Sequence, residues 1–423
     1  MSKPYTILLG KTIRSIARLR GGGSALPGLF VEHIDPSFVQ ETLATLPYGV
    51  ILISGTNGKT TTTKMVVELL ESQGFRVFTN RTGSNFVRGV AAALLGEVEH
   101  DGTLRADIAV LELDEAHAVH FVAKIQPKYS LLLNVMRDQL DRFGEIDATT
   151  RMLEKIAQAT TDGVVLNRED PRVAMIANTI ADKTVAYFGL ATELRDKFPN
   201  DDDLHGRTTS SKKQSAADVT LQSFDNETAT FLIDGSEIST PLKLQGIYNI
   251  YNGAAALALV RMIVGKAINQ PKLIDTLAVI APAFGRGETL TVNGQPLELV
   301  LVKNPSGFRL GLESFSPDGY ATMIAINDNY ADGRDMSWLW DVAFDSLREH
   351  GVAEISGVRA YDMALRMQYD DVAVAHIDVS LHRALAHFLQ SHASTPKRIY
   401  CTYTAMLALR KELAKTTNVE VIT

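Results

Sequence analysis

Short apolar runs alternate with segments of helical apolar spacing over most of the first half of the chain. The runs predict strands at 50–54, 76–80, 106–113, 129–135 and 163–167, and the segments between them predict helices at 59–73 and 147–160. Continuous apolar runs separated by helices are typical of a parallel sheet that is covered on both faces. We therefore expect an α/β domain whose ligands bind at the carboxyl ends of the strands.

The same alternation begins again in the last third of the chain. It predicts strands at 320–327, 353–358, 372–377, 398–402 and 418–422, and helices at 337–349, 361–367, 380–390 and 404–414. This pattern indicates a smaller Rossmann-like domain, although it lacks the G-x-G-x-x-G motif that would support dinucleotide binding. We expect three parts: an N-terminal helical segment at 1–48, a central domain at 49–288 and a C-terminal domain at 289–423.

Two segments differ from this pattern. Residues 4–20 predict a basic helix, which either packs on the protein body or contacts an anionic membrane surface, and the sequence leaves both interpretations open. Residues 191–217 are polar and contain few apolar residues, which indicates a surface insertion.

The strand at 50–54 ends at a glycine-rich turn that is followed by a lysine and a row of hydroxyl residues. This order predicts a short phosphate-binding loop made by Gly55, Thr56, Asn57, Gly58, Lys59, Thr60 and Thr61. Backbone N–H groups would close on phosphate oxygens, with Lys59 near the β- and γ-phosphates and the Thr60 hydroxyl on Mg²⁺. An ordinary strand-to-helix turn is the alternative interpretation.

A carboxylate, Glu112, lies at the end of the otherwise apolar strand at 106–113. Oxygen ligands suit Mg²⁺, and the ends of parallel strands meet at one edge of a sheet, where Asp114 and Asn134 also lie. We expect Glu112 to complete the metal site beside Thr60. The alternative is that Glu112 only pairs with a nearby Lys or Arg.

Composition narrows the setting of this chemistry. The formal net charge of −7 argues against general nucleic-acid binding. The single cysteine, Cys401, excludes an intrachain disulfide and a Cys-based metal site. No apolar run reaches the length of a membrane span and the N-terminus has no cleavable-signal pattern, so we expect a cytoplasmic protein.

Five motifs in this order resemble those of the Mur ligases, the ATP-dependent amide-bond ligases of peptidoglycan synthesis. They are the loop at 55–62, the strand that ends at Glu112, and the segments 137–144, 165–171 and 246–252. Within that family the chain resembles the branch that amidates lipid II. Only a short segment precedes the ATPase domain, and segments 301–307 and 327–338 match that branch.

The resemblance implies a fold and a reaction. The fold is a Mur-ligase-type central P-loop ATPase domain with a parallel-rich sheet, followed by the smaller Rossmann-like domain. ATP would phosphorylate the α-carboxylate of D-glutamate in the lipid II stem peptide, and ammonia would attack the acyl phosphate to give D-isoglutamine. A carboxylate resists amines until its oxygen becomes a leaving group, and Lys59, Thr60, Mg²⁺ and Glu112 would neutralise charge during that transfer.

Further site residues follow from family position. Asn249, Asn252 and Arg286 would hold the adenine and ribose of ATP, although the two asparagines also suit helix capping. The acceptor side would include Gly83, Asn85, Lys303 and Asn304, and turn chemistry explains the first two nearly as well.

The ammonia is expected from a partner, a GatD-type glutaminase in a heterodimer, at the inner face of the membrane. The resemblance places the acidic member of the partner's catalytic triad on this chain, at Asp335. An acid in that role orients the imidazole of the triad. Asp332 and Asp341 are the local rivals, and a helix N-cap is the alternative role for Asp335.

The chain also departs from the family. Members of the amidating branch commonly carry a four-cysteine zinc ribbon where this chain has 191–217, so no zinc is predicted there. Gln139 stands where many Mur ligases have a metal-binding His, and Lys155 lies one residue from the usual carbamylated Lys. Two other functions stay open: another Mur-type ligase that uses an amino acid or free ammonia, and a nucleotide-binding scaffold that activates a glutaminase.

Overall fold

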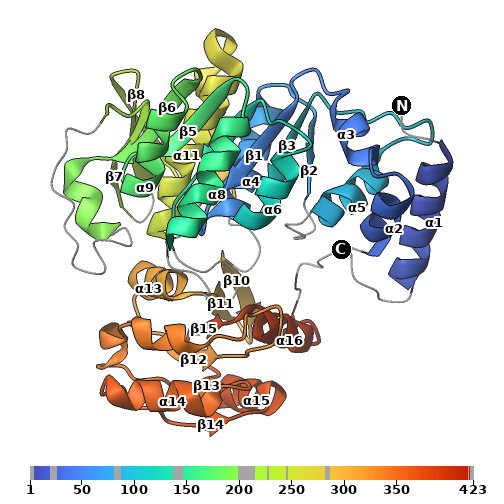
Figure 1. The fold of residues 1–423 in the computed structure, drawn as a ribbon. Coiled ribbons are helices and arrows are strands. Elements are labelled where there is room, and N and C mark those ends of the chain that lie inside the picture. The colour runs from blue at the N-terminus through green and yellow to red at the C-terminus, as the bar shows by residue number, and fades with distance from the viewer. Residues whose placement is uncertain are drawn as a thin grey trace.

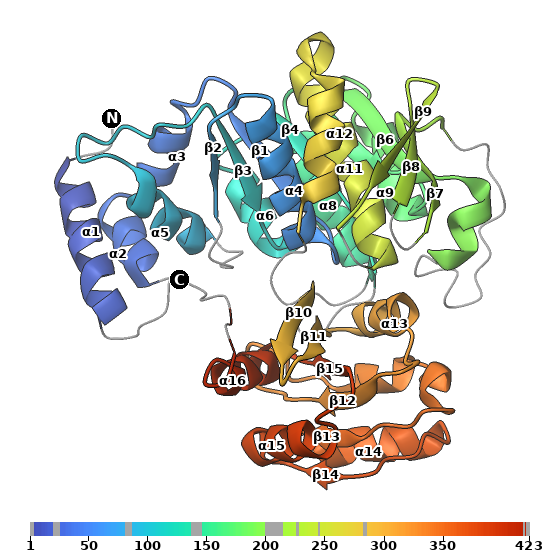
Figure 2. The same ribbon diagram turned by 180° about the vertical axis from the view of Figure 1, so that it is seen from behind.

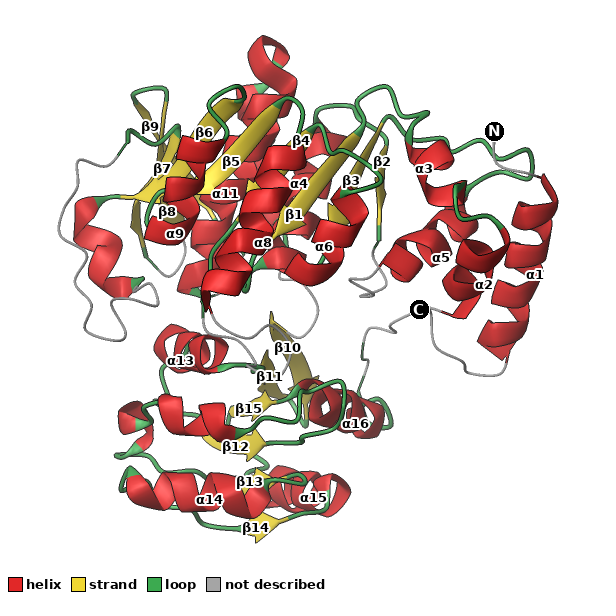
Figure 3. Ribbon diagram, viewed as in Figure 1, coloured by secondary structure: helices red, strands yellow, loops and turns green. Residues whose placement is uncertain are grey.

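The structure is a computed structural model that describes residues 4–19, 26–80, 87–136, 146–198, 215–225, 228–243, 246–281, 286–417 and 419. These residues form two sheets, one above the other in Figure 1, with a group of N-terminal helices beside the larger sheet. Figure 3 shows helices on both faces of each sheet. The predicted α/β class with parallel-rich sheets is confirmed.

The larger sheet has nine strands in the order β2-β3-β1-β4-β5-β6-β7-β8-β9 in the described part of the chain. Its neighbours pair in parallel from β2 to β7, and β8 and β9 are added as antiparallel hairpins. The strands are β1 (Val50–Ser54), β2 (Val77–Thr79), β3 (Ile108–Glu112), β4 (Tyr129–Leu132), β5 (Gly163–Asn167), β6 (Thr184–Leu190), β7 (Val219–Phe224), β8 (Thr228–Ile233) and β9 (Ser236–Pro241). Every residue of β1, β3 and β5 is buried, as expected for strands that helices cover on both faces.

Two layers of helices cover this sheet. One face carries α4 (Lys59–Ser72), α11 (Ile247–Val264) and α12 (Gln270–Val279), which face the viewer in Figure 2. The other face carries α6 (Glu115–Val122), α8 (Ile146–Ala159) and α9 (Pro171–Met175), which face the viewer in Figure 1. Short 3₁₀ turns complete the domain: η1 (Ile176–Thr179), η2 (Thr192–Lys197) and η3 (Gly265–Ala267).

The N-terminal helices extend the second of these layers. They are α1 (Pro4–Leu19), α2 (Leu26–Ile34), α3 (Phe38–Leu43) and α5 (Val87–Glu97). Gly28 lets α2 approach α5 closely, because a Cβ at this position would lie 1.9 Å from the carbonyl oxygen of Arg88.

The smaller sheet has the order β10-β11-β15-β12-β13-β14, parallel except for the β10–β11 hairpin. Its strands are β10 (Arg286–Val292), β11 (Gln295–Leu301), β12 (Ala321–Ala325), β13 (Glu354–Ser356), β14 (Ile377–Asp378) and β15 (Lys397–Cys401). Its helices are α13 (Pro305–Ser314), α14 (Ala360–Tyr369), α15 (Leu381–Ser391) and α16 (Tyr403–Leu413). The domain division after residue 288 stays a prediction, and β10 itself already belongs to this sheet.

The helix expected at 337–349 is wrong. The chain there forms two 3₁₀ turns, η4 (Ser337–Asp341) and η5 (Asp345–Leu347). Arg366 of α14 explains the difference, because its guanidinium donates hydrogen bonds to the carbonyls of Leu339 and Val342 at 3.2 and 2.6 Å. These carbonyls are thus bonded to a side chain instead of the amides of a following helical turn.

The strand expected at 418–422 lies almost wholly outside the described residues, as does most of the polar segment 191–217. Helix α11 begins at Ile247, after Gly246 with φ +88°. Among the described residues one helix, Ile247–Ala267, is long and apolar enough to cross a membrane, but most of it is buried against the larger sheet.

Candidate active site

The predicted phosphate loop joins β1 to α4 at the carboxyl edge of the larger sheet. Gly55 and Gly58 have φ values of +131° and +88°, which side chains rarely adopt. A Cβ on Gly58 would also lie 2.8 Å from the Asn252 side chain of α11. The glycines therefore allow both the turn and the close approach of α11 to the loop.

Asn134, just after β4, holds the loop from the adjacent strand. Its Oδ1 accepts a hydrogen bond from the backbone N–H of Asn57 at 2.9 Å, and its Nδ2 donates to the Asn57 carbonyl at 3.0 Å. The carbonyl of Asn134 accepts from the N–H of Thr56 at 3.0 Å. Three hydrogen bonds thus fix the loop before any ligand binds.

Lys59 is buried at the first turn of α4. Its ammonium donates to the carbonyls of Gly55 and Thr56 at 2.6 and 3.3 Å, and it pairs with Asp114 at 3.2 Å and Glu115 at 3.8 Å. These two acids begin the segment after β3, and sequence reasoning did not connect them with the lysine. Asp114 and Glu115 hold the Lys59 ammonium beside the loop.

The structure brings Thr60 and Glu112 together. The Thr60 hydroxyl donates to Glu112 Oε1 at 2.8 Å, and the Glu112 carboxylate is buried. Asn80, after β2, bonds both backbone groups of Glu112, at 2.8 and 3.0 Å, and so fixes the end of β3. A hydroxyl and a carboxylate side by side form a donor set that suits Mg²⁺, so these residues fit the expected ion.

A cleft lies between the phosphate loop, α11 and α13 of the smaller domain. Its lining includes Asn57, Gly58, Asn249, Asn252 and Lys303. Five residues named from the sequence are therefore brought together here. The alternative that Asn249 and Asn252 cap α11 is wrong, because the helix begins two residues earlier and Gly246 is the N-cap.

Asn304 links the two domains. Its Oδ1 accepts the N–H of Gly307 at 2.7 Å and so caps α13, where Pro305 takes the first helical position. Its Nδ2 donates to Asn57 Oδ1 in the phosphate loop at 3.2 Å. Asn304, which was expected on the acceptor side, thus contacts the predicted phosphate loop directly.

A second cavity adjoins the first, and it is lined in part by residues at and just after the end of β5. Sequence reasoning named this segment, 165–171, as a motif but gave its residues no role. Asn167 Oδ1 accepts the hydroxyl of Tyr251 at 2.6 Å, and Asp170 Oδ2 accepts the N–H of Val135 at 2.6 Å. Burial raises the pKa of Asp170 to about 6, against the effect of the three backbone N–H groups that it accepts. Polar residues directly after an apolar strand were the available signal.

Asp335 lies in the loop after β12, at the carboxyl edge of the smaller sheet. Its Oδ1 accepts the N–H and the hydroxyl of Ser337 at 3.0 and 2.6 Å, which is a local turn ahead of η4 and not a helix cap, because the N-cap of η4 is Met336. Its Oδ2 accepts no hydrogen bond from the residues that the structure describes. A carboxylate oxygen therefore stays available to another molecule.

The rival acid Asp332 has a structural role. It is buried, and its two oxygens accept the N–H and hydroxyl of Thr404 and the N–H of Asn329, which ties the loop to α16. Burial raises its pKa. Asp341 lies at the end of η4, and its carbonyl accepts a hydrogen bond from Arg309.

Several predicted residues cannot be placed. Gly83, Asn85 and Gln139 lie outside the described residues, and for Arg286 only the backbone is described, at the start of β10. Lys155 is exposed on α8, and Cys401 is buried in β15.

Two family models match this chain. The model of the Mur ligase middle domain matches residues 53–260, and the model of the MurT ligase C-terminal domain matches residues 301–406. The chain is 29% identical to the lipid II isoglutaminyl synthase (glutamine-hydrolyzing) subunit MurT of Streptococcus pneumoniae R6, over 96% of each chain. It is 28% identical to the subunit of the same name from Staphylococcus aureus COL, over 87% of this chain and 88% of that one.

Solved structures share the fold. A pseudomurein peptide ligase type C from Methanothermus fervidus matches with a TM-score of 0.69 and 18% identity, over 90% of this chain and 80% of that one. MurF of Thermotoga maritima in complex with ADP matches with a TM-score of 0.66 and 16% identity, over 90% and 84%. With both sheets matched by models and MurT relatives aligned along most of its length, the chain belongs to the Mur ligase family of ATP-dependent ligases, in its MurT branch.

Proposed function

We propose that this chain is the synthetase subunit of a lipid II isoglutaminyl synthase. It would transfer the γ-phosphoryl of ATP to the α-carboxylate of D-glutamate in the stem peptide, releasing ADP. Ammonia would then attack the acyl carbon and expel phosphate, leaving D-isoglutamine. The observation that carries the proposal is the meeting of Thr60 and Glu112 beside the phosphate loop, in a chain that is similar to MurT proteins along its length.

The residues of the loop support the phosphoryl transfer. The first turn of α4 directs the positive end of the helix dipole at the loop, where phosphate oxygens would lie. Lys59 would move its ammonium from the loop carbonyls to the β- and γ-phosphates, and Thr60 and Glu112 would hold Mg²⁺. When bound, that ion neutralises the charge that develops on the transferred group.

The cleft supports the placing of both substrates. Asn249 and Asn252 of α11 face it from the nucleotide side, and Lys303 and Asn304 approach from the smaller domain. We propose that the asparagines of α11 contact the nucleoside and that Lys303 attracts the anionic acceptor. Gly83, Asn85 and Arg286 stay predictions.

A partner glutaminase of the GatD type would supply the ammonia. Asp335 would complete its triad through Oδ2, while Oδ1 stays bonded to Ser337. Large exposed side chains support docking nearby. Trp340 of η4 packs edge-on against Tyr369 at 5.1 Å, and Tyr369 shares one face of α14 with Tyr361, two turns away.

Contact with the inner face of the membrane also belongs to this proposal, because lipid II carries a lipid anchor. Helices α1 and α2 pack together and expose Leu8, Leu9, Leu29 and Phe30. Exposed apolar side chains on an amphipathic helix favour a lipid surface. Flotation of the protein with anionic vesicles, compared with a Leu8→Ser/Leu9→Ser variant, tests this part independently of catalysis.

The main test is mass spectrometry of lipid II after incubation with ATP, glutamine, the purified chain and its glutaminase. We expect the mass change of OH replaced by NH₂, and no change without ATP. Addition of an amino acid would point to another Mur-type ligase. Glutamine hydrolysis without any change in lipid II would point to a scaffold that activates the glutaminase.

A further inference from the structure

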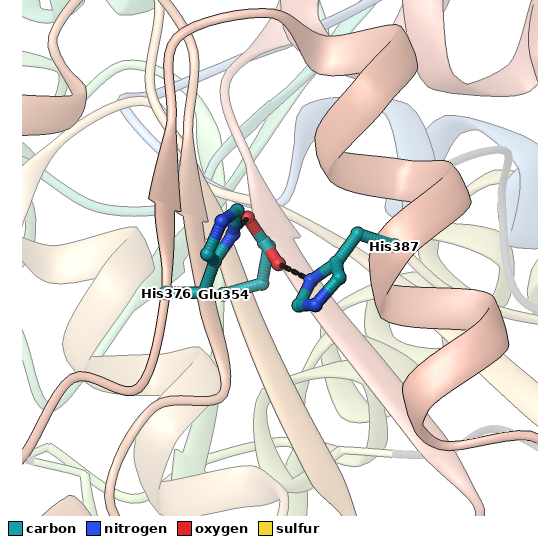
Figure 4. Close-up of side chains that lie close together, drawn as sticks. All are labelled: Glu354, His376 and His387. Atoms are coloured by element: carbon teal, nitrogen blue, oxygen red, sulfur yellow. Dashed lines mark hydrogen bonds and ion pairs between the residues drawn. The ribbon is translucent and has the colours of Figure 1, made fainter.

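Two histidines flank one buried carboxylate in the smaller domain. His376 Nδ1 lies 2.7 Å from Glu354 Oε1, and His387 Nδ1 lies 2.8 Å from Glu354 Oε2. The two rings are tilted toward each other with centroids 4.2 Å apart, and both point at the carboxylate (Figure 4). The potential ligand atoms of the three residues all lie within 4.8 Å of one another.

The cluster is separate from the candidate active site. Glu354 is the first residue of β13, so it lies at the amino end of that strand, whereas the Asp335 loop follows the carboxyl end of the neighbouring parallel strand β12. His376 comes just before β14, and His387 lies in α15. Three elements that are separate in sequence therefore supply one group each.

The carboxylate is in an unusual environment. The Glu354 side chain is 0% exposed, while those of His376 and His387 are 43% and 46% exposed. A buried charge is costly unless it is paired, and among the described residues only these two imidazoles contact its oxygens. The buried carboxylate is thus covered from solvent by two partly exposed imidazoles.

We propose that Glu354, His376 and His387 bind a divalent transition-metal ion of the zinc type. Two imidazole nitrogens and a carboxylate oxygen are a ligand set that Zn²⁺ takes in proteins, with bonds of about 2.0–2.2 Å. Adjacent ligand atoms of such a tetrahedron lie about 3.3 Å apart. The nitrogen that contacts the metal-binding oxygen must therefore retreat by about half an ångström, and the other nitrogen must turn toward that oxygen. The half-exposed rings have room for that movement.

The hydrogen-bonding groups around the cluster also allow the histidines to change from hydrogen-bond donors into metal ligands. In the metal-free arrangement each Nδ1–H donates to the carboxylate, and a metal takes the Nδ1 lone pair after the proton moves to Nε2. His387 Nε2 lies 3.2 Å from the hydroxyl of Ser391, which can then accept that proton in a hydrogen bond. A metal-bound His commonly donates its other N–H to such an oxygen.

A metal here would be structural and not part of the ligase chemistry. It would tie α15 to β13 and to the segment before β14, at the edge of the sheet. Water would take the fourth position, because the open side of the cluster lies between two exposed rings. The proposal does not depend on the proposed function.

Titration of the full chain with Zn²⁺ against a fluorescent chelator tests the site. We expect one Zn²⁺ per chain and a higher Tm on binding. With Co²⁺ in place of Zn²⁺, we expect the visible absorption bands of a tetrahedral Co²⁺ site. His387→Ala and Glu354→Gln should each weaken binding by at least about tenfold. His382→Ala is the matched control, since His382 lies on the same helix and pairs with Glu412 instead.

Two results would overturn the proposal. One is no Zn²⁺ binding in the micromolar range, which would leave a hydrogen-bonded trio only. The other is binding that is equally strong in His387→Ala, His376→Ala and the wild type, which would place the ion elsewhere. If Glu354→Gln fails to fold, the two exposed histidines still decide the question.

Discussion

Asn304 of the smaller domain donates a hydrogen bond from Nδ2 to Oδ1 of Asn57 in the phosphate loop, at 3.2 Å, across 247 positions of sequence. The same side chain caps α13 through its Oδ1. The side-chain amide of Asn304 therefore fixes the start of a helix in one domain and contacts the predicted phosphate loop of the other. A movement of the smaller domain would therefore break this hydrogen bond or displace Asn57 in the loop.

Substitution of Asn304 can separate its two roles. Asp at this position keeps an oxygen for the N–H of Gly307 but loses the donor to Asn57, whereas Ala loses both. We expect Asn304→Ala to lower the free energy of unfolding by about 1 kcal/mol, the usual cost of a lost cap. Asn304→Asp keeps the cap but should also lower the free energy of unfolding, because the buried carboxylate then faces Asn57 Oδ1. Both should lower the rate of ATP-dependent amidation. Full activity in Asn304→Asp would show that the domain contact is dispensable.

The turn between β1 and α4 could be predicted because its signals are local, and its phosphate-binding role stays a prediction. A buried strand, two glycines and a lysine follow one another, and no distant residue is needed to recognise them. The cap of α13 was also readable, since Asn304 followed by Pro305 is a helix-start signal that was not used. Strand-end acids such as Glu112 were likewise found from position alone.

The rest depended on distant contacts. The helix expected at 337–349 failed because Arg366 takes the carbonyls of the segment, and nothing near that segment reveals it. The capping alternative for Asn249 and Asn252 failed because Gly246, at φ +88°, is the N-cap of α11. The grouping of Asn252 with Gly58 arises only when the sheet has brought α11 onto the loop.

Lys59 gives a direct test of the ligase against the scaffold. Lys59→Ala removes the cation that would meet the phosphates, so we expect amidation to be lost with glutamine and with free ammonia alike. Lys64→Ala is the control, because Lys64 lies on the same helix but is partly exposed. It donates to the Ala281 carbonyl, just after α12, at 2.9 Å and pairs with Glu68 at 3.9 Å. Co-purification with the glutaminase should survive both changes. Loss of the complex in Lys59→Ala would favour the scaffold.

Gly58 should tolerate no side chain. Gly58→Ala adds a Cβ 2.8 Å from Asn252, at φ +88°, whereas Gly74 has φ +96° and nothing within 4 Å of its Cβ position. Gly74→Ala therefore costs only the backbone strain, roughly 1–2 kcal/mol, and Gly58→Ala costs more. We also expect Gly58→Ala alone to weaken nucleotide binding, measured by calorimetry with ADP. Equal losses of stability in both variants would mean that the Asn252 side chain moves aside at little cost.

Asp335 should matter for one ammonia source only. Asparagine keeps an oxygen for Ser337 but cannot stabilise an imidazolium, so Asp335→Asn should reduce glutamine-driven amidation by roughly 10²–10⁴-fold. Amidation with free ammonia should persist. Asp332→Asn is the contrast, since its amide keeps only one of the two oxygens that accept from Thr404 and Asn329, and it should lower the free energy of unfolding by about 1–3 kcal/mol. A loss of both ammonia sources in Asp335→Asn would contradict the triad role.

Asp170 predicts how stability depends on pH. Its pKa is raised from 3.8 to about 6 because it is buried, so between these values the folded state binds more protons than the unfolded state. Stability from this group is then greatest below pH 4 and falls as the pH rises through 6, by up to roughly 3 kcal/mol. Asp170→Asn removes this titration and keeps an oxygen for the start of α9.

The measurement is urea unfolding of the wild type and Asp170→Asn at pH values from 4 to 7. The difference between their free energies of unfolding should shift in favour of Asp170→Asn as the pH rises, most steeply near pH 5, midway between the two pKa values. Groups common to both proteins cancel in that difference, so other carboxylates do not obscure it. A difference that stays constant across this range would show that the carboxylate is charged throughout, and that its three backbone donors outweigh burial.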